Sequence, residues 1–279
     1  MNDSLIALLT ALGDDELIIG HRHSEWTGHA PHIEEDVAFS SIAQDEIGHA
    51  TAYYELVSQI TGDNPDRLAL GRKPGEYRHA IICERTNGDW AKTLARHWLY
   101  DTADSLRLEA LSGTAHKELS ALVVKLQREE RYHMLHAATW MSRIARGPVE
   151  GRARLIDSIA DAFAEALALF EPIEFEDEAV KEGWLPVPSD EMRARFLTHA
   201  ATGLDDLGLP SEVVSPRDQS AEFVASSSGD LIERNGNGAN GNQAEPSGLG
   251  GRHGSHSKDF DALWDEMTLT YRENPGASW

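Results

Sequence analysis

Apolar residues recur along much of the chain at intervals of three and four, which places them on one face of an α-helix. This pattern extends over residues 3–24, 33–60, 90–111 and 115–144. Clusters of glycine, proline, asparagine and aspartate separate the stretches, as at residues 61–65, and such clusters mark helix ends and turns. The pattern therefore predicts four long amphipathic helices, and no stretch reads as a β-strand.

Ionisable side chains interrupt the apolar stripe of each predicted helix at positions where a core residue is expected. The first and third helices each carry one carboxylate on the stripe. The second and fourth each carry a glutamate followed three residues later by a histidine, a spacing that puts both on one helical face. Burying such groups is costly unless each finds a partner, and a bound metal is a usual one. The set comprises Glu16, Glu46, His49, Asp101, Glu130 and His133.

The spacing of these residues predicts how they meet. Glu16 lies thirty residues before Glu46, and Asp101 lies twenty-nine residues before Glu130. Helices of this length joined by a short turn run antiparallel, so each pair is expected at the same height. Two Glu-x-x-His pairs and two further carboxylates are the ligand plan of dimetal bundles. We therefore predict an all-α fold, a ferritin-like four-helix bundle with additional C-terminal helices.

The six candidates can hold two metal ions, and their mostly oxygen donors favour iron or manganese over zinc or copper. The alternative is a vestigial, empty site whose side chains are held by internal hydrogen bonds. Asp101 is shorter than a glutamate, so it either binds a metal terminally or pairs with Arg96 or His97. We interpret His23, His97 and His136 as interface histidines, and no organic cofactor is expected in this chain.

The rest of the chain divides into a long connection and further helices. Residues 62–88 contain several glycines and two prolines, and we interpret them as the long crossover that such a bundle needs, with room for a short helix. Apolar periodicity between residues 155 and 170 predicts a fifth helix. A sixth is expected to begin at Ser189, with that serine as its N-cap.

We expect three regions in the chain. Residues 1–210 form the bundle with its extra helices. Residues 211–257 are rich in serine, glycine and asparagine and poor in aliphatic residues, which predicts a disordered linker. Residues 258–279 contain a short helix that docks back on the bundle. His253 and His256 lie in the predicted linker, and two histidines there are not expected to form a metal site.

Charge and cysteine content exclude several classes of partner. The 279-residue chain has 47 acidic and 25 basic residues and a formal net charge of −22, which repels nucleic acids and anionic membranes. No apolar run approaches membrane-spanning length, and the N-terminus lacks the basic start of a signal peptide. Cys83 is the only cysteine, so no intramolecular disulfide can form. We expect a cytoplasmic protein that binds neither nucleic acid nor membrane.

Several blocks of sequence resemble one family. They are GDDELIIGHRHSEWTGHAP at residues 13–31, IAQDEIGHA at 42–50, RYH at 131–133 and PGASW at 275–279. These blocks resemble the C subunits of phenylacetyl-CoA 1,2-epoxidases, the PaaC family of ferritin-like proteins. The resemblance covers nearly the whole chain except the predicted linker.

The resemblance implies a part in aerobic phenylacetate breakdown. The multicomponent epoxidase of that pathway oxidises the aromatic ring of phenylacetyl-CoA with O₂ and electrons from an NADPH-dependent flavin and iron–sulfur reductase. Its A subunit holds the working di-iron site, its C subunit is a structural partner, and a small B subunit bridges. The implied partners are therefore the A and B subunits and the reductase, with phenylacetyl-CoA bound mainly by the A subunit.

Two functions stay open at this point. The resemblance favours a structural, assembly subunit of the oxygenase without catalytic residues of its own. The six ligand candidates favour a subunit whose own occupied dimetal site acts as an oxidase or oxygenase component. C subunits of the family often have a degraded metal site, whereas here all six positions carry potential ligands. The net charge agrees with the first function, because CoA phosphates are repelled by an acidic surface.

Overall fold

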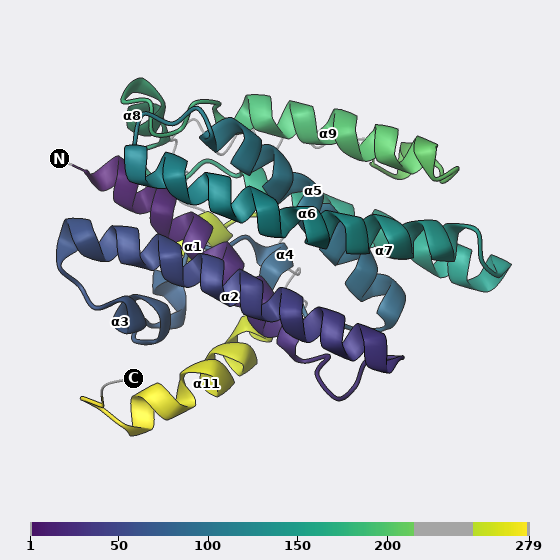
Figure 1. The fold of residues 1–279 in the computed structure, drawn as a ribbon, viewed down its shortest axis with the longest axis horizontal. Helices are drawn as coiled ribbons and strands as arrows, with labels where there is room; N and C mark the ends of the chain where they lie inside the picture. Colours follow the sequence, from purple (N-terminus) through teal and green to yellow (C-terminus); the bar gives the residue numbers. More distant parts are fainter. Residues whose placement is uncertain (1, 215–247, 278–279) are drawn as a thin grey trace, which may run out of the picture.

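The computed structural model describes residues 2–214 and 248–277, and these residues form helices and connecting loops without a β-strand. The four long helices begin and end within two residues of the predicted bounds, and they pack as a bundle with further helices against it (Figure 1). The predicted all-α bundle is thereby confirmed. It consists of α1 (Asp3–Ser24), α2 (Ile33–Thr61), α5 (Trp90–Leu111) and α6 (Lys117–Ala145).

The helices α1 and α2 pack closely at the height of the predicted ligands. A Cβ atom on Gly20 would lie 3.0 Å from the Cβ of Glu46 and 3.3 Å from the carbonyl oxygen of Ala43. Only a residue without a side chain lets the two backbones approach so closely. Because α1 is covered on several sides, the consecutive acids Asp14, Asp15 and Glu16 are all buried although they point in different directions.

The crossover between α2 and α5 contains three short helices rather than one. They are α3 (Pro65–Leu70), the 3₁₀ turn η1 (Pro74–Glu76) and α4 (Ile81–Glu84). All four residues of α4 are buried, and the helix contacts α1, α7 and α11. The crossover is thus part of the core and not a surface loop.

The outer helices cover α5, of which nearly every residue is buried. The covering face of α7 is Leu155, Ile159 and Phe163, and that of α9 includes Phe196 and Leu204. The elements after the bundle are α7 (Val149–Ala166), η2 (Leu167–Phe170), α8 (Glu176–Lys181), α9 (Ser189–Asp206) and η3 (Ser211–Val214).

Ser189 is the first residue of α9, but it is not the N-cap that the sequence predicted. Pro188 occupies the N-cap position, and no side chain caps the helix. The Ser189 hydroxyl instead donates to Oε2 of Glu176 at 2.7 Å. This longer-range hydrogen bond ties the start of α9 to α8 and competes with the local capping contact.

Part of the predicted linker is packed against the bundle. Residues 248–257, which we call the return segment, contain the 3₁₀ turn η4 (Gly251–His253), whereas residues 215–247 lie outside the described residues. A Cβ atom on Gly251 would lie 2.2 Å from the carbonyl oxygen of His79. The return segment therefore runs backbone to backbone along the crossover, a packing that a glycine-rich sequence permits.

The last helix, α11 (Lys258–Glu273), follows the return segment and lies against α3, η1 and α4. Figure 1 shows it in yellow, below α2. Phe260 and Leu263 are buried, and the indole N–H of Trp264 donates to the carbonyl oxygen of Arg72 at 2.8 Å. The apolar face of this helix therefore packs mainly on the crossover, and its first turn also accepts a hydrogen bond from Arg22 of α1 at 2.8 Å.

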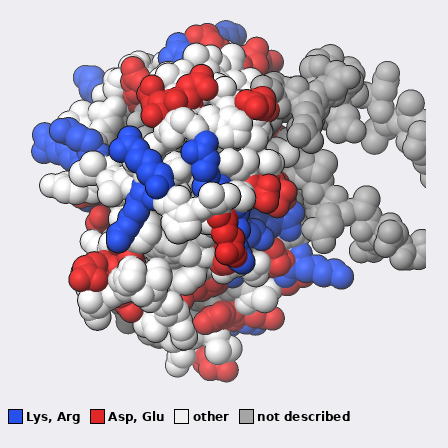
Figure 2. Space-filling model, turned by 90° about the vertical axis from the view of Figure 1, so that its right-hand side faces the viewer, with Lys and Arg blue, Asp and Glu red and all other residues white. Residues whose placement is uncertain are grey.

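The surface charge is uneven. Figure 2 views the end of the molecule where α6 passes into α7, and on this face Lys and Arg side chains gather beside Asp and Glu. Arg143 and Arg154 line a hollow at this junction together with Trp90 and Trp140. Arg154 pairs there with Asp89 at 3.3 Å. Among the described helices, none is long and apolar enough to cross a membrane.

Two apolar clusters lie toward opposite ends of the long bundle, beside a larger cluster that the bundle shares with the outer helices. The first includes Leu9, Val57 and Val123, and the second contains Phe39, Leu94 and Trp140. In α2, α5 and α6 the predicted ligands lie between residues of these two clusters in the sequence, and in α1 Glu16 follows the residues of the first. A buried polar layer is thereby enclosed by apolar side chains above and below.

Candidate metal centre

The polar layer brings together residues from three bundle helices. Glu16 of α1, Glu46 and His49 of α2 and Glu130 of α6 each offer a ligand atom within 4.8 Å of the others. All four side chains are buried. The equal heights that the sequence spacing predicted for Glu16 and Glu46 place both acids beside the same imidazole.

His49 stands among three glutamates. Its Nδ1 lies 3.3 Å from Oε2 of Glu16, 3.7 Å from Oε2 of Glu46 and 3.7 Å from Oε1 of Glu130. His133 joins the group from α6, with its Nδ1 3.0 Å from Oε1 of Glu130 and 3.5 Å from Oε1 of Glu46. Glu46 and Glu130 therefore lie between the two histidines, where carboxylates that bridge two metals are found in such bundles.

Asp101 is buried but stands apart from the four-residue group. Its Oδ2 lies 3.2 Å from Nδ1 of His97, one turn earlier on α5. Burial raises the pKa of Asp101 to about 7. The structure thus places Asp101 beside His97, one of the two residues with which the sequence predicted that it could pair.

Two acids adjoin the outer nitrogens of the histidines, and the sequence pattern did not predict either contact. Nε2 of His49 on α2 lies 3.0 Å from Oε2 of Glu129 on α6, and Nε2 of His133 on α6 lies 3.5 Å from Oδ2 of Asp45 on α2. A carboxylate on the second nitrogen orients a metal-binding imidazole and increases its basicity. The sequence does contain a signal for these contacts, because an acidic residue directly precedes the glutamate in both Glu-x-x-His motifs.

The three histidines expected at helix interfaces form a row beside the polar layer. From Asp101 the row continues through Nε2 of His97 to Nδ1 of His136 at 3.2 Å, and from Nε2 of His136 to Oε2 of Glu35 at 2.8 Å. His23 packs edge-on against His97, with ring centroids 5.1 Å apart. Polar contacts therefore extend from the buried layer to the partly exposed Glu35.

Without a metal, the charges of the layer balance only if several groups hold protons. Burial and the nearby charge of Glu16 raise the pKa of Glu46 well above its usual range. Burial lowers the pKa of His49, but Glu16 and Glu130 outweigh it and raise that pKa to about 9. Burial likewise opposes the charged form of His133, and the Glu130 carboxylate outweighs it, so that this pKa is raised as well. A metal ion binding here would displace these protons.

The donor set fits metal ions. Both carboxylate oxygens of Glu46 and Glu130, and Nδ1 of His49 and His133, are buried and find no hydrogen-bond partner among the described residues. Buried polar atoms nearly always have such a partner, and an unplaced ion is one explanation for exceptions. Carboxylate oxygens with few imidazole nitrogens suit iron or manganese. The cluster can therefore bind metal, with Asp101 outside its inner group.

The chain is similar in sequence to two subunits of one epoxidase. The chain is 24% identical over 278 residues to the C subunit of the 1,2-phenylacetyl-CoA epoxidase of Escherichia coli strain K12, which covers 99% of this chain and 100% of that protein. It is also 24% identical over 202 residues to the A subunit of the same epoxidase, which covers 68% of this chain and 65% of that protein. The sequence model of one family matches residues 1–222. The chain therefore belongs to the phenylacetic acid catabolic protein family.

Proposed function

We propose that the chain is a structural subunit of a multicomponent oxygenase that epoxidises the ring of phenylacetyl-CoA. The observation that carries this proposal is the extent of the similarity, which spans both chains end to end for the C subunit of the epoxidase but only about two thirds of each for its A subunit. In this function the chain holds a catalytic A-type subunit in place. A flavin and iron–sulfur reductase and a small B-type subunit complete the system in the cytoplasm.

An exposed apolar surface supports a docking function. Ile33 and Val37 at the start of α2 are 73% and 65% exposed, and Tyr132 and Leu135 on α6 are 74% and 63% exposed. The hydrogen bond between Glu35 and His136, 2.8 Å long, shows that these two stretches lie side by side. Apolar groups gathered on a surface mark protein interaction sites. We assign this α2–α6 face to the catalytic partner subunit.

The charge of the chain supports the same division of roles. CoA carries several phosphate charges, and a chain with a net charge of −22 repels them over most of its surface. Phenylacetyl-CoA is then bound mainly by the partner. A direct test of the docking face is Leu135→Glu, which should abolish co-purification with the A subunit, while the exposed Leu269→Glu on α11 should not.

The buried ligand set favours a second candidate function, in which the chain has a working dimetal site. Glu16, Glu46, His49, Glu130 and His133 would hold two iron or manganese ions, with Asp101 as a further candidate. Iron held there would supply oxygen-activating redox chemistry. The protein's own contribution is to orient the two imidazoles through Glu129 and Asp45 and to exclude water by burial.

Metal content tests whether the site is occupied. Protein purified from iron-replete cells should carry up to about two iron or manganese ions per chain, the content of a dinuclear site. Glu46→Ala combined with His49→Ala should remove them. Elemental analysis that finds less than a tenth of an equivalent, even after anaerobic loading, would show that the site is vestigial.

Reconstitution decides between the two functions. The isolated chain with reductase should show no NADPH- and O₂-dependent turnover of phenylacetyl-CoA, and addition of the A and B subunits should start turnover through a stable complex. Glu130→Ala with His133→Ala should then leave turnover near normal, because the chemistry takes place in the A subunit. The milder pair Glu130→Gln with His133→Gln controls for misfolding. A loss of several orders of magnitude with the complex intact would overturn the structural assignment.

A further inference from the structure

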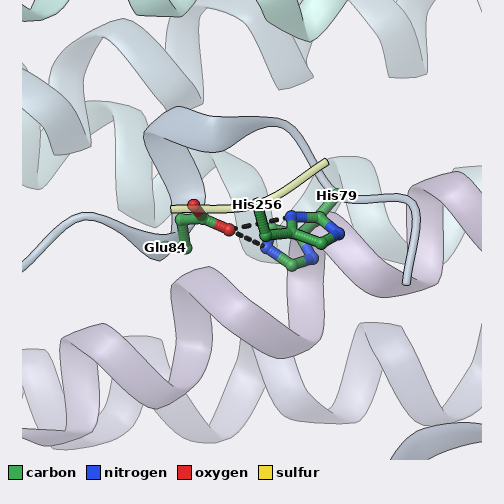
Figure 3. Close-up of side chains that lie close together, drawn as sticks. All are labelled: His79, Glu84 and His256. Atoms are coloured by element: carbon green, nitrogen blue, oxygen red, sulfur yellow. Dashed lines mark hydrogen bonds and ion pairs between the residues drawn. The ribbon is translucent and has the colours of Figure 1, made fainter. Parts of the chain in front are cut away.

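A second group of metal-type ligands lies outside the bundle centre. His79 lies in the crossover just before α4, and Glu84 is the last residue of α4. His256 lies in the return segment. Nε2 of His79 lies 2.7 Å from Oε2 of Glu84, and Nδ1 of His256 lies 2.9 Å from the same oxygen. Figure 3 shows both contacts meeting at this oxygen. Ligand atoms of all three residues fall within 4.8 Å of one another.

The group is closed to solvent. The side chains of His79 and Glu84 are fully buried, and that of His256 is 4% exposed. The second oxygen of Glu84 accepts the backbone N–H of Ser257 at 2.5 Å.

The orientation of His256 requires a positive charge beside Glu84. Nε2 of His256 lies 3.1 Å from the carbonyl oxygen of Tyr77, and a carbonyl oxygen only accepts, so this nitrogen carries a proton. In the neutral imidazole, Nδ1 then presents a lone pair to the Glu84 carboxylate at 2.9 Å. Two acceptors at this distance repel unless a proton or a metal ion lies between them. A histidine whose outer N–H donates to a backbone carbonyl is a recurrent arrangement at metal sites.

His79 presents Nε2 to the same carboxylate oxygen, at 2.7 Å. Its other ring nitrogen, Nδ1, is buried without a hydrogen-bond partner among the described residues. The rings of His79 and His256 are stacked, with centroids 4.1 Å apart and planes inclined by 15° (Figure 3). Nε2 of His79 and Nδ1 of His256 consequently face the Glu84 carboxylate from the same side.

We propose that His79, Glu84 and His256 bind one divalent ion, with zinc as the best match, and that this ion fastens the return segment to the crossover. Two imidazoles and one carboxylate, with a fourth position for water, form a known zinc ligand set. This donor set differs from the carboxylate-rich bundle centre, so the two sites are expected to prefer different metals. The inference does not depend on the proposed oxygenase function.

The geometry needs only a small adjustment. Zinc bonds of about 2.0–2.1 Å in a tetrahedron separate the ligand atoms by about 3.3 Å, whereas the two nitrogens now lie 2.7 and 2.9 Å from Oε2 of Glu84. Movement of the Glu84 carboxylate by about half an ångström creates the required space. Since His256 and Glu84 are 172 positions apart in the sequence, an ion between them would link two distant parts of the chain.

Zinc titration of the full-length protein tests the proposal. Zinc chloride is added to protein whose bundle centre has first been loaded anaerobically with iron, and bound zinc is measured for the wild type, His256→Asn and His253→Asn. His253 lies in the same segment with its side chain 58% exposed, so it is a matched control. The wild type and His253→Asn should bind one more equivalent of zinc than His256→Asn, or bind it about 100-fold more tightly. Hydrogen exchange at residues 256–260 should slow with zinc in the first two proteins only.

Equal zinc binding by the wild type and His256→Asn would overturn the proposal. Near-UV circular dichroism checks that the variant is folded. If it is not, anomalous scattering at the zinc edge from wild-type crystals decides the question. A peak between the three side chains supports the site, and its absence after soaking in zinc chloride overturns it.

Discussion

Replacement of Arg252 should destabilise the protein strongly, although this residue lies in a segment whose composition suggested disorder. Its guanidinium is buried, with Nη2 2.7 Å from Oδ2 and Nη1 3.0 Å from Oδ1 of Asp15 on α1. It also donates to three backbone carbonyl oxygens, those of Ala11, Arg78 and Leu169. Burial raises the pKa of Asp15, but the charges of Arg252 and Arg107 outweigh it and lower that pKa.

The size of the stability loss follows from the groups that lose Arg252 as their hydrogen-bond and ion-pair partner. Arg252→Met keeps most of the side-chain volume but leaves the buried Asp15 with Arg107 as its cation, at 2.6 Å, and removes the donor from three buried carbonyls. Removing one partner of a buried ion pair costs about 3–5 kcal/mol. Because Arg107 stays in place, we expect a loss near the lower end, about 3 kcal/mol.

Urea unfolding followed by tryptophan fluorescence measures this loss as a shift of the midpoint at constant slope. Arg195→Ala is the control, because Arg195 forms an exposed ion pair with Glu191 at 2.7 Å, and such pairs contribute about 0.3–0.5 kcal/mol. The double variant Asp15→Asn, Arg252→Met gives the coupling between the two residues. A loss below about 1 kcal/mol for Arg252→Met would refute the view that the return segment is held by a buried ion pair.

Three further outcomes are expected from the packing. Gly20→Ala should lower the free energy of unfolding by about 1–3 kcal/mol and reduce metal loading, because the new Cβ would lie 3.0 Å from the Cβ of Glu46. Gly48→Ala on α2 is the control and should not destabilise the protein, because a Cβ there would meet nothing within 4 Å. Burial raises the pKa of Cys83 well above its usual range, so Ellman's reagent should not react with the native protein at pH 8 but should titrate one thiol in guanidinium; rapid labelling of the native protein would contradict this. After cleavage at a protease site inserted between residues 215 and 247, the C-terminal fragment should co-elute with the body in gel filtration, and Arg252→Met should release it; release from the wild type would show that α11 and the return segment are weakly held.

The inward positions of the metal ligands could be predicted from the sequence because helical periodicity is a local property. Glu46 and His49, like Glu130 and His133, share a seam with apolar residues before and after them, and any amphipathic helix buries that seam. The distance from Glu16 to Glu46 also predicted their common height, since two antiparallel helices and a short turn leave little choice. The resemblance to one family was confirmed by a family model over residues 1–222 and by the similarity to an epoxidase C subunit over 99% of the chain.

The partners of the polar side chains were decided by the tertiary structure. Asp101 lies on the predicted seam, and the sequence left its partner open; in the structure its carboxyl lies beside His97 of the same helix, because the side-chain direction depends on the neighbours that pack around it. The pairing of His49 with Glu129, across two helices, depends in the same way on how α2 and α6 are rotated against each other. A sequence pattern places a residue on a face but does not choose its partner.

The packing of the return segment was the feature that the sequence predicted least well. It is poor in aliphatic residues, and the periodicity of apolar positions carries no information on a segment that is held by polar contacts. Arg252 binds Asp15 across 237 positions of sequence and His256 binds Glu84 across 172. The sequence by itself determined the bundle and its polar layer, because repeated local burial encodes them. Only the folded chain decided where the tail docks, because that depends on charges and backbone groups which the crossover and α1 present together.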